Sequence, residues 1–150
     1  MKVKGLKATL VPNVPELLIG KLEFRSTTSL EEYDAKLFSY SLTKIVEQMI
    51  EDKIDLKNVP RTSAVFTDYG QLDLIFEEDT LGTNLNLIVY AVKKWEDLHA
   101  DEQAKVFIFL EEMCHWIWNI TDEVEVKYKV IEILKRIYPG IEVSINSKGL

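Results

Sequence analysis

Cysteine is nearly absent from the sequence: Cys114 is the only one in 150 residues. A single thiol forms no disulfide within the chain and builds no cysteine-based structural zinc site. Cys114 lies among aromatic residues, which is typical of an inert packed thiol rather than a nucleophile.

Long apolar runs are also missing. No stretch reaches the roughly 18 to 20 apolar residues that a membrane-spanning helix needs. The first residues, Met1-Lys2-Val3-Lys4, lack the apolar region of a secretory signal. We therefore expect a cytoplasmic protein with no membrane partner.

Positive charge is scarce and dispersed. The chain has 18 Lys and Arg against 25 Asp and Glu, for a formal net charge of -7. Binding to phosphates depends on clustered basic side chains. The composition therefore argues against a nucleic-acid partner.

Several enzyme signatures are absent, including a P-loop, a dinucleotide glycine pattern and a Ser-His-Asp order. No internal repeat or low-complexity tract interrupts the chain. With 47% hydrophobic and 29% charged residues, the composition is that of an ordinary globular protein. We expect residues 1–150 to form a single domain with one core.

The first half of the chain predicts two strands and a long helix. Residues 3–11 alternate and suit a strand, and residues 16–25 suit a second strand with a turn or bulge at Gly20. The Ser and Thr residues of 26–29 are good N-cap candidates. Apolar residues at spacings of three and four then predict a helix with one buried face across residues 37–50.

The middle of the chain predicts further strands. Residues 64–67 and 72–76 flank Gly70 in the manner of a hairpin. Residues 85–92 suit a strand or the start of a helix, and we favour a strand. Residues 141–145 alternate and predict an edge strand.

Two successive helices are predicted near the C-terminus, over residues 101–118 and 122–138, with Pro139-Gly140 as the stop. The fold class that follows is α+β: a small, mostly antiparallel sheet, a long N-terminal helix and two C-terminal helices.

The first of these two helices carries its polar groups on one strip. Apolar side chains cover most of its circumference, while Glu111, Glu112, His115 and Asn119 share the remaining arc. On the second helix, Glu123 and Lys127 fall near the centre of the apolar face, where an unpaired charge is costly. They need partners: each other as an i, i+4 ion pair, the strip on the first helix, or a bound ion.

The polar strip has the spacing of a metal site. Residues at i and i+4 project from the same side of a helix, so Glu111 and His115 are placed to contact one cation. Glu112 stands where metallohydrolases keep the carboxylate that takes a proton from metal-bound water. Glu123, on the next helix, is placed to act as a third ligand.

On these residues, Leu98 to Tyr138 resembles the core of the minimal gluzincin-type metallopeptidases, related to the phage-immunity family that cleaves repressors. That family has a long N-terminal helix, a small sheet, a helix bearing His-Glu-x-x-His and a downstream helix that supplies an acidic ligand. The resemblance implies that Glu112 is the general base, His115 the second ligand, and Glu123 or Glu125 the acidic ligand.

The motif departs from the family at its first position, where Glu111 replaces a histidine. A carboxylate makes the ligand set harder, which disfavours zinc and leaves manganese, iron or magnesium, or no metal at all. The strip is equally typical of a solvated helix face. Two hypotheses follow: a noncatalytic interaction domain, binding another protein or a second copy of the chain, and a metal-dependent hydrolase that uses Glu112. The first is favoured.

Overall fold

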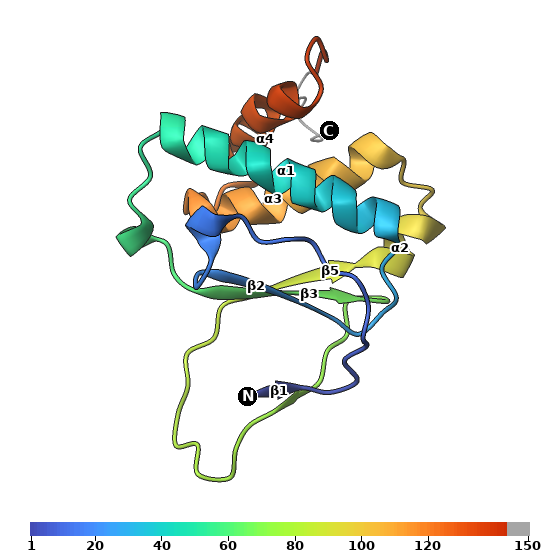
Figure 1. Cartoon of the computed structure of the whole chain (residues 1–150), viewed down its shortest axis with the longest axis vertical. Coiled ribbons are helices and arrows are strands. Elements are labelled where there is room, and N and C mark those ends of the chain that lie inside the picture. Colours follow the sequence, from blue (N-terminus) through green and yellow to red (C-terminus); the bar gives the residue numbers. More distant parts are fainter. Residues whose placement is uncertain (144–150) are drawn as a thin grey trace.

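The chain folds as α+β, with helices over one face of a small parallel sheet. This computed structural model describes residues 1–143. Figure 1 shows the helices stacked above the sheet, with a separate short ribbon of strands on the opposite side. None of the described helices has the length and hydropathy needed to cross a bilayer.

Eleven elements make up the described part of the chain. In order they are β1 Lys2–Val3, η1 Glu16–Leu18, β2 Leu22–Ser26, α1 Glu32–Glu51, η2 Leu56–Asn58, β3 Thr62–Thr67, β4 Leu74–Ile75, β5 Leu87–Ala91, α2 Val92–Asp97, α3 Glu102–Ile117 and α4 Glu123–Ile137. The η elements are single turns of 3-10 helix.

The main sheet is parallel, so the predicted antiparallel sheet is wrong. Its strand order is β2-β3-β5, and β3 pairs in parallel with both neighbours. A parallel pair needs a crossover connection, and α1 provides one between β2 and β3. The central strand β3 is almost entirely buried, because it has a strand on each side and helices over one face.

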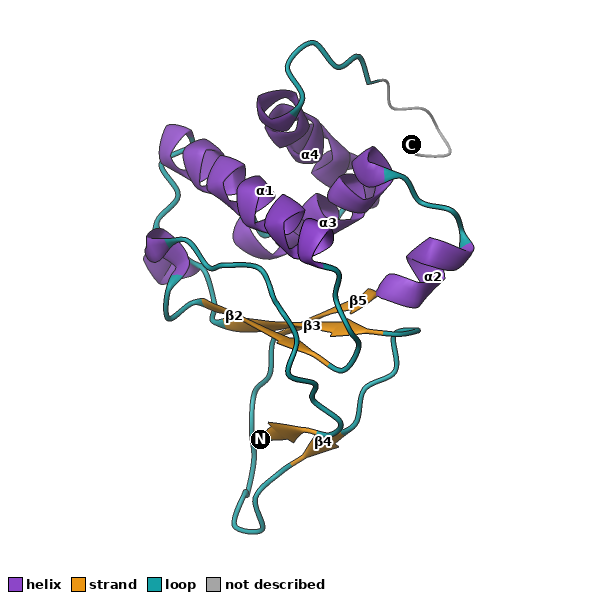
Figure 2. Cartoon of the chain, turned by 45° about the vertical axis from the view of Figure 1, so that its right-hand side comes forward, coloured by secondary structure: helices purple, strands orange, loops and turns teal. Residues whose placement is uncertain are grey.

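The predicted hairpin around Gly70 does not form. Gly70 adopts the left-handed conformation of a turn residue, with φ 89°. However, both edges of β3 are already occupied by β2 and β5, so the segment after the turn runs away from it. Its short strand β4 pairs antiparallel with β1 instead, as Figure 2 shows.

The N-terminal strand is much shorter than predicted. β1 ends at Val3 because Gly5 turns the chain with a φ of 79°. Beyond the turn, Lys7 donates its N–H to the carbonyl of Ser26 rather than continuing a ladder. In residues 16–25, the first part forms η1 and the strand begins only after Gly20.

The helix predictions are confirmed for α1, α3 and α4. Asp101 caps α3 by accepting from the N–H of Ala104, and Asp122 caps α4 by accepting from the N–H groups of Val124 and Glu125. The expected cap of α1 is wrong: Glu31 occupies the N-cap position and makes no side-chain cap bond.

The structure tests the predictions for residues 85–92 fully and those for residues 141–145 in part. Residues 85–92 contain both predicted alternatives, because β5 leads directly into α2. Ile141 to Val143 are not a strand. The rest of that predicted edge strand, Ser144 and Ile145, lies outside the described residues.

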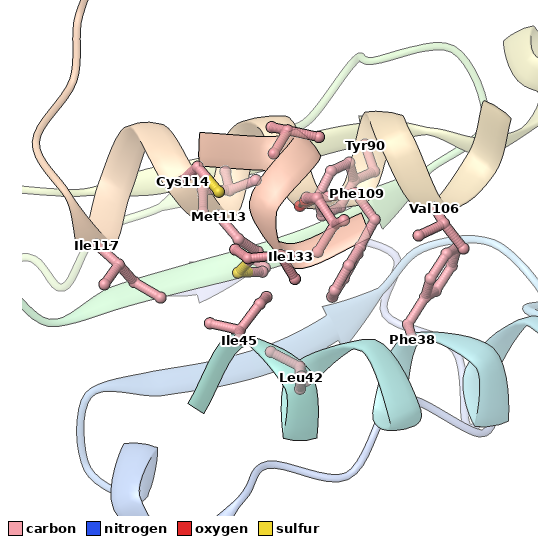
Figure 3. Close-up of a cluster of buried hydrophobic side chains, with 14 of the residues drawn as sticks. Phe38, Leu42, Ile45, Tyr90, Val106, Phe109, Met113, Cys114, Ile117 and Ile133 are labelled. Carbon is pink, nitrogen blue, oxygen red and sulfur yellow. Dashed lines mark hydrogen bonds between the residues drawn. The ribbon is translucent and has the colours of Figure 1, made fainter. Parts of the chain in front are cut away.

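Aromatic stacking joins the sheet to the helices. Phe109 of α3 stacks on Phe38 of α1 with ring centroids 4.6 Å apart, and it also stacks on Tyr90 of β5 at 5.4 Å. The hydroxyl of Tyr90 donates to the carbonyl of Phe109 at 2.7 Å. These rings belong to the buried cluster drawn in Figure 3. α3 is thereby fixed against β5, and this contact positions the polar strip.

Candidate functional site

The predicted ligand residues converge where α3 meets α4. Glu111 and His115 lie one turn apart on α3, and Glu123 starts α4. One ligand atom from each of the three residues lies within 4.8 Å of the other two. The downstream acidic residue is therefore Glu123, and Glu125 is exposed outside the group.

The turn between the two helices orients His115. Asn119 ends α3 in the left-handed conformation, with φ 53°. The chain doubles back after it, so the carbonyl of Ile120 accepts a hydrogen bond from Nδ1 of His115. This bond leaves Nε2 facing the carboxylate of Glu123 at 3.3 Å. A histidine held in this way has one nitrogen available for a cation or a proton.

The environment of His115 favours its charged form. Burial lowers the pKa of the imidazole, but the Ile120 carbonyl and the negative charges of Glu123 and Glu112 outweigh burial, so the pKa lies above its ordinary value of 6.5. When His115 is protonated, Glu123 is its ion-pair partner.

Glu111 is paired with a lysine. The ammonium Nζ of Lys127 lies 3.2 Å from a carboxylate oxygen of Glu111 and donates to the main-chain carbonyl of Glu123 at 3.1 Å. The side chains of Lys127 and Glu111 are only 13% and 21% exposed. The i, i+4 ion pair between Glu123 and Lys127 is therefore not formed, and the strip on α3 is the partner of Lys127.

Glu112 lies apart from these pairs and faces a cleft. Among the described residues, the carboxylate of Glu112 has no hydrogen bond or ion pair. Burial is the main cause of the raised pKa of its carboxyl; His115 lowers the pKa, while the negative charges of Glu111 and Glu123 raise it. Burial is the main cause of the raised pKa of Tyr90 on β5, and the negative charge of Glu112 adds to it.

The cleft lies between α3 and the start of β5 and has a volume of about 400 Å³. Its lining residues are Pro60, Thr62, Leu85, Asn86, Leu87, Ile88, Glu112, His115, Trp116 and Asn119. Trp116 donates its indole N–H to the carbonyl of Pro60 at 2.7 Å, which holds the α3 side of the cleft against the chain before β3.

Sequence reasoning did not find the contribution of Pro60, Thr62 and the residues before β5. No spacing in the sequence brings these segments beside α3, since they meet only through the order of strands in the sheet. The one local signal of this part of the cleft was the uncharged apolar run that forms β5. Cys114 agrees with its predicted role: it is fully buried, and burial raises the pKa of its thiol.

Glu111, His115 and Glu123 are suitable ligand types for a divalent cation, but the charge of Glu111 is already neutralised by Lys127. Two carboxylates and an imidazole nitrogen are suitable donors. However, the ammonium of Lys127 is already a cation against Glu111. A metal ion at the three ligands would have to displace it or accept repulsion from it.

Comparison with known proteins gives no family: no family model, characterised protein or solved structure matches this chain. The resemblance to metallopeptidases therefore remains a hypothesis that depends on the residues of α3 and α4.

Protonation of His115 should stabilise the fold. Because its folded pKa is raised, the stabilisation is complete below the unfolded value of 6.5 and is lost as pH rises through the higher folded value. We expect the difference in unfolding free energy between wild type and His115→Gln to be larger at pH 5.5 than at pH 9, measured by urea denaturation. An equal difference at both pH values would contradict the pairing with Glu123.

Proposed function

We propose that this chain is a noncatalytic protein-interaction domain that binds an extended segment of another protein along the free edge of β5. The observation that supports the proposal is that the outer main-chain groups of β5 have no partner among the described residues. Among the described strands, β5 is the last of the sheet and has only β3 as a neighbour.

The hydrogen-bond register shows which groups of β5 are free. The N–H of Ser63 donates to the carbonyl of Asn86, so in a parallel ladder the residues at 86, 88 and 90 face β3. The main-chain groups of Leu87 and Val89 therefore point away from the sheet. No described residue hydrogen-bonds to them. Such an edge is a template for an added strand.

The composition of the two edges supports this choice. Proteins commonly protect an open edge with charged side chains. The other edge strand, β2, contains Glu23 and Arg25, which pair with each other at 3.2 Å. β5 contains no charged residue, and Val89 on it is 37% exposed. An uncharged, partly exposed edge favours binding of an extended partner.

The internal pairing of the motif supports a noncatalytic role. Three of its four residues are paired within the chain: Glu111 with Lys127, and His115 with Glu123. Lys127 neutralises Glu111 in the place where a metal ion would be needed. The cleft is present, while the charge of Glu111 that a cation would neutralise is already neutralised by Lys127.

A proline at position 89 tests this edge. The N–H of Val89 points outwards, so Val89→Pro removes no bond of the sheet and proline is tolerated at such positions. We expect wild type to select binders from a displayed library of random linear peptides. These binders should lose about tenfold in affinity to Val89→Pro, because an edge hydrogen bond is lost and the ring obstructs pairing.

Val89→Ala is the matched control, since it shortens the same side chain and keeps the N–H. It should bind the selected peptides within about threefold of wild type, less than one hydrogen bond is worth. Thermal unfolding checks that both variants are folded. Selection of no peptide, or equal binding by Val89→Pro, would contradict the proposal.

A metal-dependent hydrolase is the second candidate, favoured by the convergence of Glu111, His115 and Glu123 within 4.8 Å. Those three residues would hold the ion, and Glu112 would accept a proton. A bound divalent cation would supply Lewis acidity and an acidified water.

Glu111→His distinguishes the two candidates because it replaces the carboxylate with the neutral ligand that zinc prefers. If the wild-type pairing excludes metal, wild type should bind Zn²⁺ and Mn²⁺ weakly, and Glu111→His should bind Zn²⁺ at least about tenfold more tightly by calorimetry. Glu125→His, on the exposed face of α4, is the control and should show no gain. Tight binding by wild type that His115→Ala abolishes would favour the hydrolase instead.

A further inference from the structure

The cleft beside β5 is lined by a carboxylate, that of Glu112, together with apolar and aromatic residues. This inference rests on the proposed function, since it names the kind of segment that the β5 edge receives. The cleft opens beside the first residues of β5 and contains the side chain of Glu112. Its volume of about 400 Å³ is many times the roughly 30 Å³ that one water molecule occupies.

Glu112 differs from the three charged groups around it. Glu111 is paired with Lys127, and His115 is paired with Glu123 and the Ile120 carbonyl. Glu112 has no such partner among the described residues, although it is partly buried. A carboxylate that is partly removed from water without a partner is destabilising. A positive group entering the cleft would relieve this cost.

The walls of the cleft suit the rest of a basic side chain. Leu85, Ile88 and Trp116 are apolar and aromatic residues that line the cleft together with Glu112. Lysine and arginine have long aliphatic stems that pack on such surface while the charged end reaches further. An aromatic ring near the charge adds a favourable cation–π contribution.

A strand added along β5 would place some of its side chains next to the cleft. A segment that pairs with the outward main-chain groups of Leu87 and Val89 extends the sheet by one strand. Its side chains alternate between the two faces of the sheet. Every second side chain therefore lies on the face that carries α3, next to the opening of the cleft.

We propose that the β5 edge recognises an extended segment with one lysine or arginine, whose side chain enters the cleft and pairs with Glu112. The net charge of -7 favours the approach of a basic segment and disfavours an acidic one. Acidic or purely apolar segments would leave the carboxylate unpaired.

The test uses a positional-scanning library of extended octapeptides, in which each position in turn is Lys, Arg, Met or Glu. Binding to wild type is compared with binding to Glu112→Gln, an isosteric change that removes the charge. We expect wild type to prefer Lys or Arg over Met by about tenfold at one position, because the ion pair forms out of bulk water. Glu112→Gln should remove this preference and leave binding of the Met peptide unchanged.

Glu31→Gln is the matched control, because Glu31 is an exposed carboxylate before α1 and outside the cleft. It should retain the preference for a basic residue. If peptides bind in a manner that Val89→Pro abolishes but show no basic preference, or if Glu112→Gln keeps that preference, this inference is wrong and the proposed function stands. If no peptide binds, or Val89→Pro binds as wild type does, the proposed function fails and the inference fails with it.

Discussion

The ion pair between Lys127 and Glu111 determines what the motif on α3 can do. Its two side chains are largely shielded from water, so either charge alone would be costly. The ammonium also binds the carbonyl of Glu123, which joins the first turn of α4 to the middle of α3. One lysine therefore stabilises the packing of two helices and supplies the positive charge that a metal ion would otherwise supply.

The parallel sheet places this neutralised motif beside an open strand edge. Phe109 and Tyr90 hold α3 over β5, so the polar strip of α3 lies next to the last strand of the sheet. That strand has no charged residue to protect its edge. Among the described residues, an open strand edge and a cleft lined by the unpaired carboxylate of Glu112 thus lie side by side, and the proposed recognition of an extended basic segment depends on this combination.

The helices were predictable from the sequence because their signals are local. Apolar residues at spacings of three and four identified α1, α3 and α4, and Asp101 and Asp122 are caps of the expected type. The sheet was not predictable in the same way. A short apolar run such as residues 64–67 pairs with whichever strand the whole chain brings beside it, and the turn at Gly70 did not determine that partner.

The sequence predicted which residues form the candidate site, but not which of them form ion pairs with each other. Spacing on one helix placed Glu111 and His115 together. The predicted apolar position on the next helix is confirmed for Lys127, which is largely buried and paired, but it is wrong for Glu123, whose side chain is 71% exposed. Sequence could not decide between an ion pair within α4 and one between helices, because that choice depends on how α3 and α4 are rotated. The cleft depends on residues before β3 and β5, which are distant in sequence from α3.

The central claim is that Lys127 is the resident cation of the motif, and a double-mutant cycle tests it most directly. Unfolding free energies would be measured for wild type, Glu111→Gln, Lys127→Met and the double variant. The account predicts a favourable coupling energy of roughly 0.5 to 3 kcal/mol, the range for residues in direct contact. Additive effects, with no coupling beyond about 0.3 kcal/mol, would show that the two charges do not depend on each other and would contradict the account.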